Sequence, residues 1–348
     1  MSQQLSRGRR GPSMADVARE AGVSGQTVSR VANGRDNVDQ ETRQRVLDAM
    51  RRVGYRPNSA ARALRNGRFR SIGVIMSTLS TFGGSRTLEA IASAAVARGY
   101  SITLRPVVHP TQREVTGAFS RLDEQAVDGV LVLIHERELD ESEIELPAGL
   151  PVVVIDANPR SDYPSVDTDQ AEGAVLATEH LLALGHETVW HIAGPPHSYA
   201  AERRRKSWQA TLARHGRPIP DALTGDWSAE SGYRLAQRLC DDPAVTAVFT
   251  ANDQMALGLL RALHERGRSV PGDVSVVGFD DMAESRFFWP PLTTVRQSFG
   301  EVGRRAVEAL LDEITTGTAD ATAVRVPTEL VLRSSTTPPR SQAGKSDS

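Results

Sequence analysis

The sequence has one cysteine, Cys240, and no long apolar run. One thiol cannot form an intrachain disulfide or a four-thiolate metal site. No stretch reaches the roughly eighteen apolar residues of a membrane-spanning helix, and residues 1–30 lack the apolar core of a signal peptide. These absences argue against a disulfide-stapled extracellular protein and a membrane protein. We expect a soluble cytoplasmic protein with no metal and no other cofactor.

The net charge of −2 is small, but the charges are unevenly distributed. Residues 1–70 hold fifteen arginines, no lysine and six acidic residues, which gives this segment +9 and leaves −11 for the rest. A basic segment on an acidic body is typical of a nucleic-acid-binding module joined to a domain with another task. A solvated basic tail would have the same charge, so the sequence pattern must decide.

Helical periodicity in the basic segment predicts three short helices. Residues 13–21 place apolar side chains on one face, with Ser13 as the cap. A Gly22-Val23-Ser24 turn with a second cap follows, and the helical pattern restarts over residues 26–33. A third helix over residues 40–53 ends at Gly54, and we expect it to bury Val46, Leu47 and Met50. Two helices around a glycine-containing turn, supported by a third, make a helix-turn-helix domain.

In a helix-turn-helix domain the second helix enters the major groove of DNA. We therefore expect Gln26, Thr27 and Ser29 to face DNA, and Arg30 to bind guanine through two hydrogen bonds. Gln26 and Arg30 are the preferred base readers. Without the surrounding motif, both residues would be read as ordinary exposed helix surface.

Residues 58–67 predict one more helix, with Asn58 as the cap and Gly67 as the stop. A helix of about two turns is marginal in water by itself. It has too few apolar residues to own a core, which argues against a core role for Leu64.

From Ser71 the pattern changes to alternating strands and helices. Apolar runs suited to buried parallel strands occupy residues 72–76, 102–108, 129–134, 152–155, 188–192, 245–250 and 274–279. Helical stretches lie between them at residues 88–98, 113–125, 170–184, 203–214, 229–239 and 253–265. Two doubly wound α/β units that face each other across a cleft would produce this order.

Polar residues follow several of these strands, at the edge where ligands bind in parallel sheets: Ser77, Asp156, Asn252-Asp253 and Asp280-Asp281. Carboxylates can accept hydrogen bonds from the hydroxyls of a polyol, Arg204 and Asn252 can donate, and the Trp227 indole offers a flat apolar face to a sugar ring. Each residue at a strand end could instead be a local turn residue, and Asn252 or Asp253 could cap the next helix.

The sequence argues against an enzyme. Asp280 and Asp281 are adjacent, so at most one of them faces the cleft easily, which argues against a two-carboxylate glycosidase. No glycine-rich phosphate loop follows a predicted strand. We expect the four histidines at positions 180, 186, 191 and 197 to be loop and surface residues. In residues 203–206, a solvated helix face with one inward arginine is the simplest interpretation.

Several motifs in the basic segment resemble, in order, the DNA-binding domain of the lactose and galactose repressor family, the LacI-type transcriptional regulators. They are Met14-Ala-Asp-Val-Ala-Arg-Glu-Ala-Gly-Val-Ser24, Thr27-Val-Ser-Arg-Val31, Asn33-Gly34, Glu41-Thr-Arg-Gln-Arg-Val46 and Gly54-Tyr-Arg-Pro-Asn58. The chain departs from the family at Gly25, where relatives often have a bulky or polar base reader.

Four body motifs extend the resemblance and are most similar to the lactose repressor branch of the family. They are Gly225-Asp-Trp-Ser-Ala-Glu-Ser-Gly232, Ala251-Asn-Asp-Gln-Met-Ala-Leu-Gly258, Val274-Ser-Val-Val-Gly-Phe-Asp-Asp281 and Pro290-Pro-Leu-Thr-Thr-Val-Arg-Gln297. The resemblance covers residues 13–336.

The resemblance implies a helix-turn-helix head and a bilobal body like that of periplasmic binding proteins. It also implies a hinge helix that folds when two copies pair in the minor groove, with Leu64 as an apolar wedge that opens a central base step and bends the DNA. The DNA-binding residues it implies are Ser24, Gln26, Thr27, Ser29, Arg30, Asn33, Tyr55, Asn58, Ala61 and Leu64. The effector-binding residues it implies are Ser77, Asp156, Arg204, Trp227, Asn252, Asp280, Gln297 and Phe299.

The function implied is that of a homodimeric repressor of a sugar-utilisation operon, released from a pseudo-palindromic operator by a sugar. A corepressor or a non-sugar effector on the same fold is the first alternative. The second is a sugar-binding transport protein, which the bilobal body also resembles.

We expect a disordered tail at residues 1–12, a helix-turn-helix domain at 13–57, a hinge helix and linker at 58–70, an effector-binding and dimerisation domain at 71–336, and a disordered tail at 337–348. The N-subdomain would comprise residues 71–167 and 298–325, and the C-subdomain residues 168–297 and 326–336. Crossover strands near residues 166–168, 295–297 and 325–327 would join them. No leucine heptad follows Leu332, so a tetramer-forming coiled coil is not expected.

Overall fold

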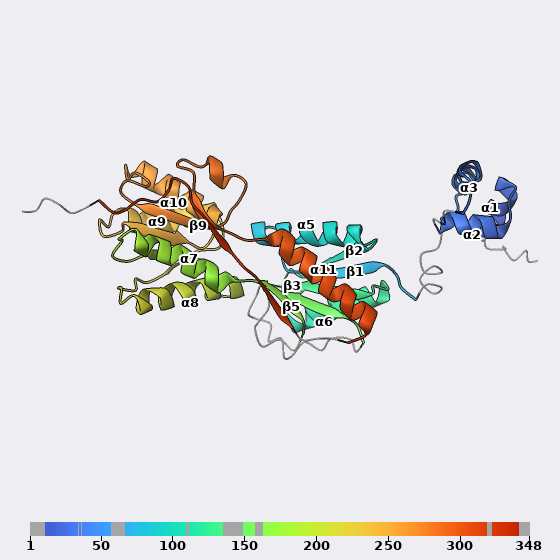
Figure 1. Cartoon of the computed structure of the whole chain (residues 1–348), viewed down its shortest axis with the longest axis horizontal. Coiled ribbons are helices and arrows are strands. Elements are labelled where there is room, and N and C mark those ends of the chain that lie inside the picture. The colour runs from blue at the N-terminus through green and yellow to red at the C-terminus, as the bar shows by residue number, and fades with distance from the viewer. Residues whose placement is uncertain are drawn as a thin grey trace, which may run out of the picture. The chain divides into compact units, whose positions relative to one another are not determined.

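The computed structural model describes residues 11–33, 35, 37–56, 67–108, 111–134, 149–156, 163–318 and 322–340. The chain forms two compact units, a head at residues 1–69 and a body at residues 70–348 (Figure 1). The predicted hinge helix, with Asn58, Ala61 and Leu64, lies outside the described residues, as do residues 1–10 and 341–348 of the predicted tails.

Three helices build the head, and local signals set their ends. They are α1 (Met14–Ala21), α2 (Gly25–Ala32) and α3 (Gln40–Val53). Ser13 and Asp16 form a reciprocal capping box at the start of α1, and the Ser24 hydroxyl caps α2 by accepting a hydrogen bond from the backbone N–H of Thr27. Gly22 and Gly54 end α1 and α3 with φ of 63° and 68°, which glycine adopts without strain.

The head has its own small core. It is formed by Val17, Val28, Val31, Val46, Ala49 and Met50. The prediction for Leu47 was wrong, because this side chain is 40% exposed. Val46, Ala49 and Met50 follow the i, i+3, i+4 spacing of one helix face, and Leu47 is rotated about 100° away from Val46.

The body consists of two α/β lobes. The N-lobe sheet has the order β11-β5-β4-β3-β1-β2, built from β1 (Ser71–Met76), β2 (Ser101–Pro106), β3 (Gly129–Leu133), β4 (Val152–Ile155), β5 (Ser165–Thr168) and β11 (Ala323–Val326). The C-lobe sheet has the order β12-β10-β9-β8-β6-β7, built from β6 (Trp190–Ala193), β7 (Leu223–Thr224), β8 (Ala247–Thr250), β9 (Ser275–Asp280), β10 (Thr293–Arg296) and β12 (Glu329–Val331). Neighbouring strands run parallel except for β12, which pairs antiparallel with β10 at the edge.

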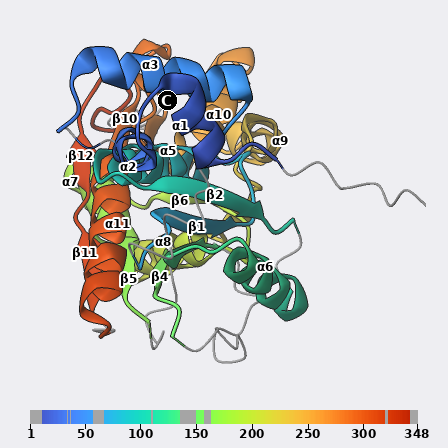
Figure 2. The same ribbon diagram turned by 90° about the vertical axis from the view of Figure 1, so that its right-hand side faces the viewer.

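Helices cover both faces of each sheet. In the N-lobe, α5 (Phe82–Ala97) and α11 (Phe299–Thr316) pack on one face and α6 (Gln112–Glu124) on the other, as Figure 2 shows. In the C-lobe, α7 (Gln170–Ala183) and α8 (Tyr199–Arg214) cover one face, and α9 (Ala229–Cys240) and α10 (Asp253–Glu265) cover the other. A short 3₁₀ helix, η2, spans Ser285–Phe287.

Period-two alternation distributes the strand side chains between these layers. Val74 of β1 packs beneath α5 and α11, whereas the next residue, Ile75, packs beneath α6. Each sheet is therefore buried on both faces, which is why its strands read as continuous apolar runs.

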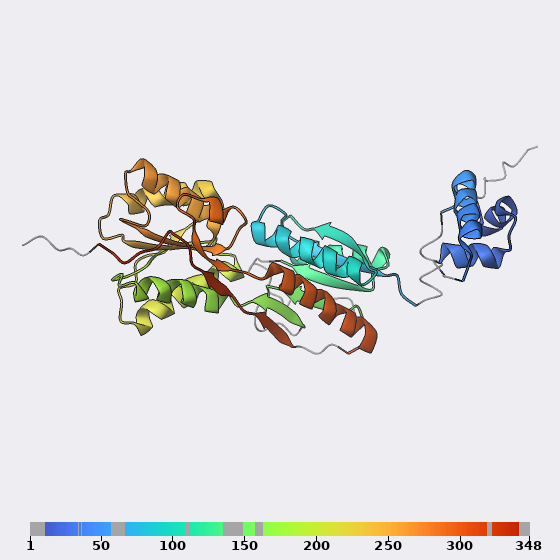
Figure 3. The ribbon, with the colours of Figure 1, turned by 45° about the horizontal axis from the view of Figure 1, so that its top comes forward.

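The chain crosses between the lobes three times (Figure 3). The crossings follow β5, β10 and β11, close to the three predicted places. The backbone N–H of Asp169 donates to the carbonyl of Val326 at 2.8 Å, which ties the first crossing to the third. Ligand-binding residues at these crossings would be sensitive to any movement of one lobe against the other.

Three features of the body differ from the predictions. The strand and helix order read from the sequence omitted α11, β7 and β12, and it began α5 at residue 88 instead of Phe82. The predicted C-terminal tail was wrong for residues 337–340. The Thr337 carbonyl accepts a hydrogen bond from the Ser275 hydroxyl at 2.9 Å, and Arg340 pairs with Asp273 at 2.9 Å. None of the helices in the described ranges is long and apolar enough to cross a membrane.

Candidate functional site

A cavity of about 340 Å³ lies between the two lobes of the body. This volume is within the range of small-molecule binding sites. All eight residues predicted to bind an effector line it: Ser77, Asp156, Arg204, Trp227, Asn252, Asp280, Gln297 and Phe299. They come from strand ends, helix starts and loops of both lobes, and the structure brings them to one place.

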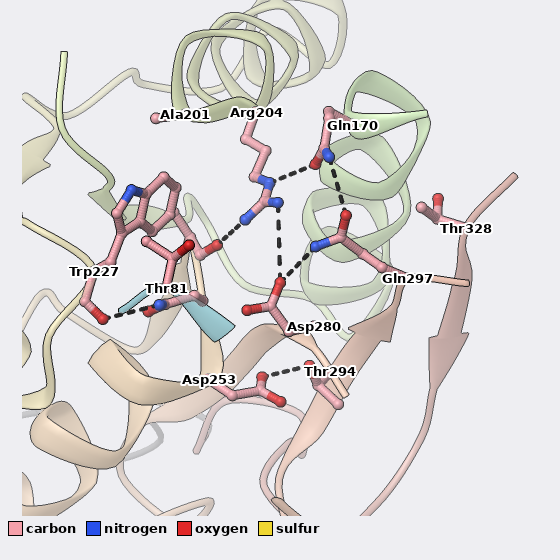
Figure 4. Close-up of polar contacts among 12 residues, drawn as sticks. Thr81, Gln170, Ala201, Arg204, Trp227, Asp253, Asp280, Thr294, Gln297 and Thr328 are labelled. Carbon is pink, nitrogen blue, oxygen red and sulfur yellow. Dashed lines mark hydrogen bonds and ion pairs between the residues drawn. The ribbon is translucent and has the colours of Figure 1, made fainter. Parts of the chain in front are cut away.

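Arg204 forms the centre of the polar wall (Figure 4). Helical periodicity places it on the buried face of α8 with Ala201 and Trp208, so it is only 4% exposed. Its guanidinium donates to the side-chain oxygen of Gln170 at 2.8 Å and to the backbone carbonyl of Ala251. The prediction of one inward arginine in residues 203–206 is confirmed.

Asp280 lies at the end of β9, 4.0 Å from the Arg204 guanidinium. Burial raises the pKa of Asp280 to about 7, against the opposing effect of the Arg204 charge. Burial also lowers the pKa of Arg204 to about 10, so the arginine stays charged at neutral pH. The wall therefore holds one permanent donor and one carboxyl group that can exchange a proton near physiological pH.

Asp281 points away from the cavity. Its carboxylate pairs with Arg296 at 2.7 Å and with Arg333. Those two arginines hold the pKa of Asp281 below its usual value, although burial opposes them. The expectation that only one of the two adjacent aspartates faces the cleft is confirmed.

Trp227 forms an apolar surface beside Arg204. The Arg204 guanidinium carbon lies 5.5 Å from the centre of its ring. A Cβ at Gly194 would come within 2.3 Å of the indole, so this glycine makes room for the ring. Three lining residues have a positive backbone φ that residues other than glycine rarely adopt: 74° at Trp227, 57° at Asp156 and 116° at Asp280. Such backbone conformations cluster at binding sites.

Asn252 has two roles. Its side-chain oxygen caps α10 by accepting from the backbone N–H of Met255 at 2.8 Å, and its amide donates to the Trp227 carbonyl at 2.9 Å. The neighbouring Asp253 is fully buried and does not line the cavity. It accepts hydrogen bonds from Ser285 at 2.6 Å and Thr294 at 2.5 Å, and burial raises its pKa to about 6. Of the two candidates for the helix cap, Asn252 is the cap.

The N-lobe contributes the opposite wall. Ser77 follows β1 and Asp156 follows β4, as predicted from the strand ends. The Phe299 and Phe82 rings meet edge to face, with centroids 5.8 Å apart. The cavity thus has aromatic groups on both lobes and polar groups between them, an arrangement that suits a ligand with both hydroxyls and an apolar face.

Several lining residues were not predicted. They include Thr78, Phe82, Gln170, His197, Asp226 and Gln254. Gln170 is the first residue of α7, and it follows a crossing between the lobes. A polar side chain at the start of a helix directly after a predicted strand was the available signal for Gln170.

The histidine prediction was wrong for two of the four residues. His186 and His191 are each only 1% exposed. His191 stacks on Phe249 with ring centroids 4.7 Å apart, and burial lowers its pKa to about 3. Within the described residues, no group of three or more histidine, cysteine or acidic side chains could hold a metal ion.

In the head, the side chains of the predicted DNA-binding residues differ in whether they already have partners within the protein. Gln26 and Arg30 are exposed and have no side-chain hydrogen bond to the described residues. The hydroxyls of Ser24 and Thr27 bond to each other at 3.0 Å, and the Asn33 amide lies 3.2 Å from the Ser29 hydroxyl. Tyr55 packs against the head core. Gln26 and Arg30 are therefore the side chains with most freedom to contact an outside partner.

Two families match the chain. Residues 13–58 match the bacterial regulatory proteins of the lacI family, and residues 178–336 match the periplasmic binding protein-like domain. The lactose operon repressor of Escherichia coli strain K12 is 36% identical over 330 residues, which cover 94% of this chain and 91% of that protein. The HTH-type transcriptional repressor PurR of Haemophilus influenzae strain PittEE is 33% identical over 327 residues, covering 92% and 97%.

Solved structures agree with these matches. The lac repressor dimer bound to operator and the anti-inducer ONPF superposes with a TM-score of 0.83 at 34% identity, covering 94% of this chain and all of that one. A complex of the transcriptional regulator CelR with cellobiose superposes with a TM-score of 0.70 at 32% identity, covering 93% and 99%. The predicted fold class, a helix-turn-helix head with a bilobal α/β body, is confirmed. The chain belongs to the lacI family of bacterial regulatory proteins and is a DNA-binding transcriptional repressor, not an enzyme.

Proposed function

We propose that this repressor controls a sugar-utilisation operon and leaves its operator when a sugar binds the cavity between the lobes. The observation that carries the proposal is the composition of the cavity wall. Asp156 and Asp280 can accept hydroxyl hydrogens, Arg204 can donate, and the Trp227 indole can lie against the apolar face of a sugar ring. The effector-binding role of all eight lining residues predicted from the sequence is part of this proposal.

The relatives favour a sugar but also name the main alternative. The lactose operon repressor and the CelR–cellobiose complex are named for sugars, whereas the HTH-type transcriptional repressor PurR is not. A corepressor or a non-sugar effector on the same fold is therefore the second candidate. An anionic effector is disfavoured, because three aspartates line the cavity and Arg204 already faces Asp280.

For DNA, we propose that α2 enters the major groove with Gln26 and Arg30 as base readers. Ser24, Thr27, Ser29, Asn33 and Tyr55 would position the head, and Asn58, Ala61 and Leu64 would act in the minor groove. The +9 charge of residues 1–70 supplies affinity for phosphates. One head contacts only a half-site, so the proposal requires a homodimer, the state in which the lac repressor is bound to operator in the similar crystal structure. A repressor of this kind acts in the cytoplasm.

Release follows if the sugar prefers the lobe arrangement in which the two hinge segments separate. Because the chain crosses between the lobes three times next to the cavity, a ligand held by both lobes affects their relation directly. A hundredfold induction needs about 2.7 kcal/mol of differential affinity between the bound and released states.

Titration of the protein on its operator tests the effector class. Lactose, cellobiose, monosaccharides and purine bases would be added to the protein–operator complex, and release would be followed by fluorescence anisotropy. Release by a sugar, and not by a purine base, supports the proposal. Tighter operator binding with a purine base would support the corepressor alternative, and no response to any sugar would contradict the proposal.

The sequence also left open a sugar-binding transport protein, which membership of the lacI family of bacterial regulatory proteins excludes. The division of roles between the head and the body can still be tested. A variant without residues 1–70 should lose operator binding and keep sugar binding if the chain is a sugar-responsive repressor. Operator binding by the body alone would contradict the assignment of DNA binding to the head.

A further inference from the structure

Four buried side chains form a closed ring of polar contacts on the cavity wall (Figure 4). Arg204 Nε donates to Gln170 Oε1 at 2.8 Å, and Gln170 Nε2 donates to Gln297 Oε1 at 3.0 Å. Gln297 Nε2 then donates to Asp280 Oδ1 at 2.5 Å. The 4.0 Å contact between Arg204 and Asp280 Oδ1 closes the ring.

The direction of these hydrogen bonds has one chemical origin. A guanidinium group has only donors, so Gln170 must turn its oxygen toward Arg204. The Gln170 amide then faces Gln297 as a donor, so Gln297 must turn its oxygen toward Gln170. Its amide nitrogen is thereby directed at Asp280. Each glutamine has a single orientation that satisfies both neighbours.

We propose that Gln170 is a positioning residue of the effector site. Because Arg204 can only donate, Gln170 is fixed as a donor to Gln297, and the Gln297 amide is thereby directed at Asp280 and keeps Asp280 Oδ1 an acceptor. This inference rests on the proposed function only in assuming that the cavity binds the effector. Asp280 Oδ2 has no hydrogen bond to the described residues and is the oxygen left for a ligand. Asp280 would accept a ligand hydroxyl when ionised and would hold its proton on Oδ2 when neutral.

The ring joins two of the crossings between the lobes. Gln170 follows β5 by two residues, and Gln297 follows β10 directly. Their hydrogen bond links positions 127 residues apart in the chain, where the lobes meet. Gln170 is only 2% exposed, so its amide cannot exchange its protein partners for bulk water.

Other charged groups also act on Asp280. Arg204 favours its ionised form, whereas Asp253 and Asp156 oppose ionisation. Asp281 is paired with Arg296 and Arg333 on the other side of the strand end, and His197 and Asp226 line the cavity. None of these groups is changed by substitution at position 170. The substitution Gln170→Glu does add a negative charge that itself raises the pKa of Asp280, so the test needs a background that keeps this charge and lacks the Gln297 amide.

The test is the titration of Asp280 in the sugar-free protein with Gln170→Glu and Gln170→Met. The Asp280 carboxyl carbon would be followed by NMR in ¹³C-aspartate-labelled protein and assigned with Asp280→Asn. A carboxylate at position 170 still accepts from Arg204 but cannot donate to Gln297. Gln297 must then turn its oxygen toward Asp280, which requires a proton on that side.

With Gln170→Glu, the Asp280 midpoint should move up by at least one pH unit more than the same substitution moves it in Gln297→Met, where the new charge is present but no amide links position 170 to Asp280. With Gln170→Met, which removes the contacts without reversing them, it should stay within half a unit of the wild-type value. An equal shift by Gln170→Glu in the wild-type and Gln297→Met backgrounds, or an equal shift by Gln170→Glu and Gln170→Met, would overturn the proposal. If the glutamate variant is too unstable to purify, proton exchange of the Gln297 amide should be at least tenfold faster in Gln170→Met, and unchanged exchange would overturn the proposal.

A second measurement separates this inference from the proposed function. Calorimetric titration with lactose and with cellobiose at pH 6 to 9 should show at least tenfold weaker binding to Gln170→Glu at pH 7, and recovery toward pH 9. If neither sugar binds any variant while the Asp280 midpoint shifts as described, the ring stands and the sugar assignment fails. If sugar binds but the midpoints do not shift, the role of Gln170 fails and the sugar assignment stands.

Discussion

The guanidinium carbon of Arg204 lies 3.7 Å from the centre of the Phe279 ring. The ring comes from β9, in the same sheet that carries Asp280, and it supports the planar cation from one side. The donors of the Arg204 guanidinium meanwhile face Gln170 and the Ala251 carbonyl. This position requires a flat group with several donors in fixed directions, which an arginine has and a lysine lacks.

We therefore predict that Arg204→Lys raises the sugar concentration for half-release from operator at least tenfold, and that operator binding without sugar is retained. The ammonium group cannot stack on Phe279 while it donates to both partners. Operator release followed by fluorescence anisotropy measures the effect. Arg214→Lys is the matched control, because Arg214 lies on the same helix but is 56% exposed and pairs only at the surface with Glu179. Equal effects of the two variants would contradict the role of Arg204.

Gly194→Ala should impair the sugar response without changing any lining side chain. The new Cβ would come within 2.3 Å of the Trp227 indole, so the ring must move out of its place beside Arg204. The measurement is the lactose or cellobiose dependence of operator release, with at least a tenfold higher half-release concentration expected. Gly117→Ala is the control, since its Cβ would meet no atom within 4 Å. A normal response of Gly194→Ala would show that the position of Trp227 is unimportant.

Stability should fall as the pH drops below 6.5, and His191 should cause part of that fall. Its folded pKa is about 3 and its reference value is 6.5, so below pH 6.5 the unfolded chain binds a proton that the folded protein does not. The contribution of His191 to the free energy of unfolding is complete above pH 6.5 and is lost toward pH 3, by up to about 1.4 kcal/mol for each pH unit.

His191→Phe should reduce this slope, at the cost of the hydrogen bond from His191 Nδ1 to the Phe249 carbonyl at 2.8 Å. Urea unfolding at pH 7, 6 and 5, at one protein concentration, measures it. His264→Phe, which changes an exposed histidine, is the control substitution, and His191→Phe should reduce the slope more than it does. A His191→Phe protein with the wild-type slope would show that another group is responsible.

Much of the fold could be predicted because its signals are local. The bounds of α3 follow from Asp39, whose side chain caps the helix, and from Gly54, which ends it. The helix α11 was missed although it has 18 residues, because no side chain caps its start and only Gln297 and Ser298 separate it from β10. The start of α5 was missed because Gly83 and Gly84, which usually break helices, lie in its first turn.

The site was predictable where strand ends determine it and unpredictable where tertiary contacts do. Asp156 and Asp280 follow buried strands, and parallel strand ends converge at one edge. The roles of Asn252 and Asp253 could not be separated from the sequence, since only the positions of Ser285 and Thr294 show that Asp253 faces the interior. His191 was misassigned because its burial depends on the Phe249 and Trp208 rings of a neighbouring strand and helix.

In the head, Arg30→Ala should weaken operator binding by about 1–3 kcal/mol, the value of one good two-point contact to a base. Binding to unrelated DNA should change far less, because Arg30 would read a base edge and contributes only one of fifteen arginines in residues 1–70 to phosphate affinity.

Arg52→Ala is the control with the same change of charge. Arg52 pairs with Glu20 at 2.7 Å and is 58% exposed on α3, so its loss should weaken operator and unrelated DNA alike. Competition binding at several salt concentrations separates the two effects, because loss of a phosphate contact lowers the salt dependence and loss of a base contact does not. If Arg30→Ala reduced binding to both DNAs equally, Arg30 would be a phosphate contact and Gln26 would be left as the preferred base reader.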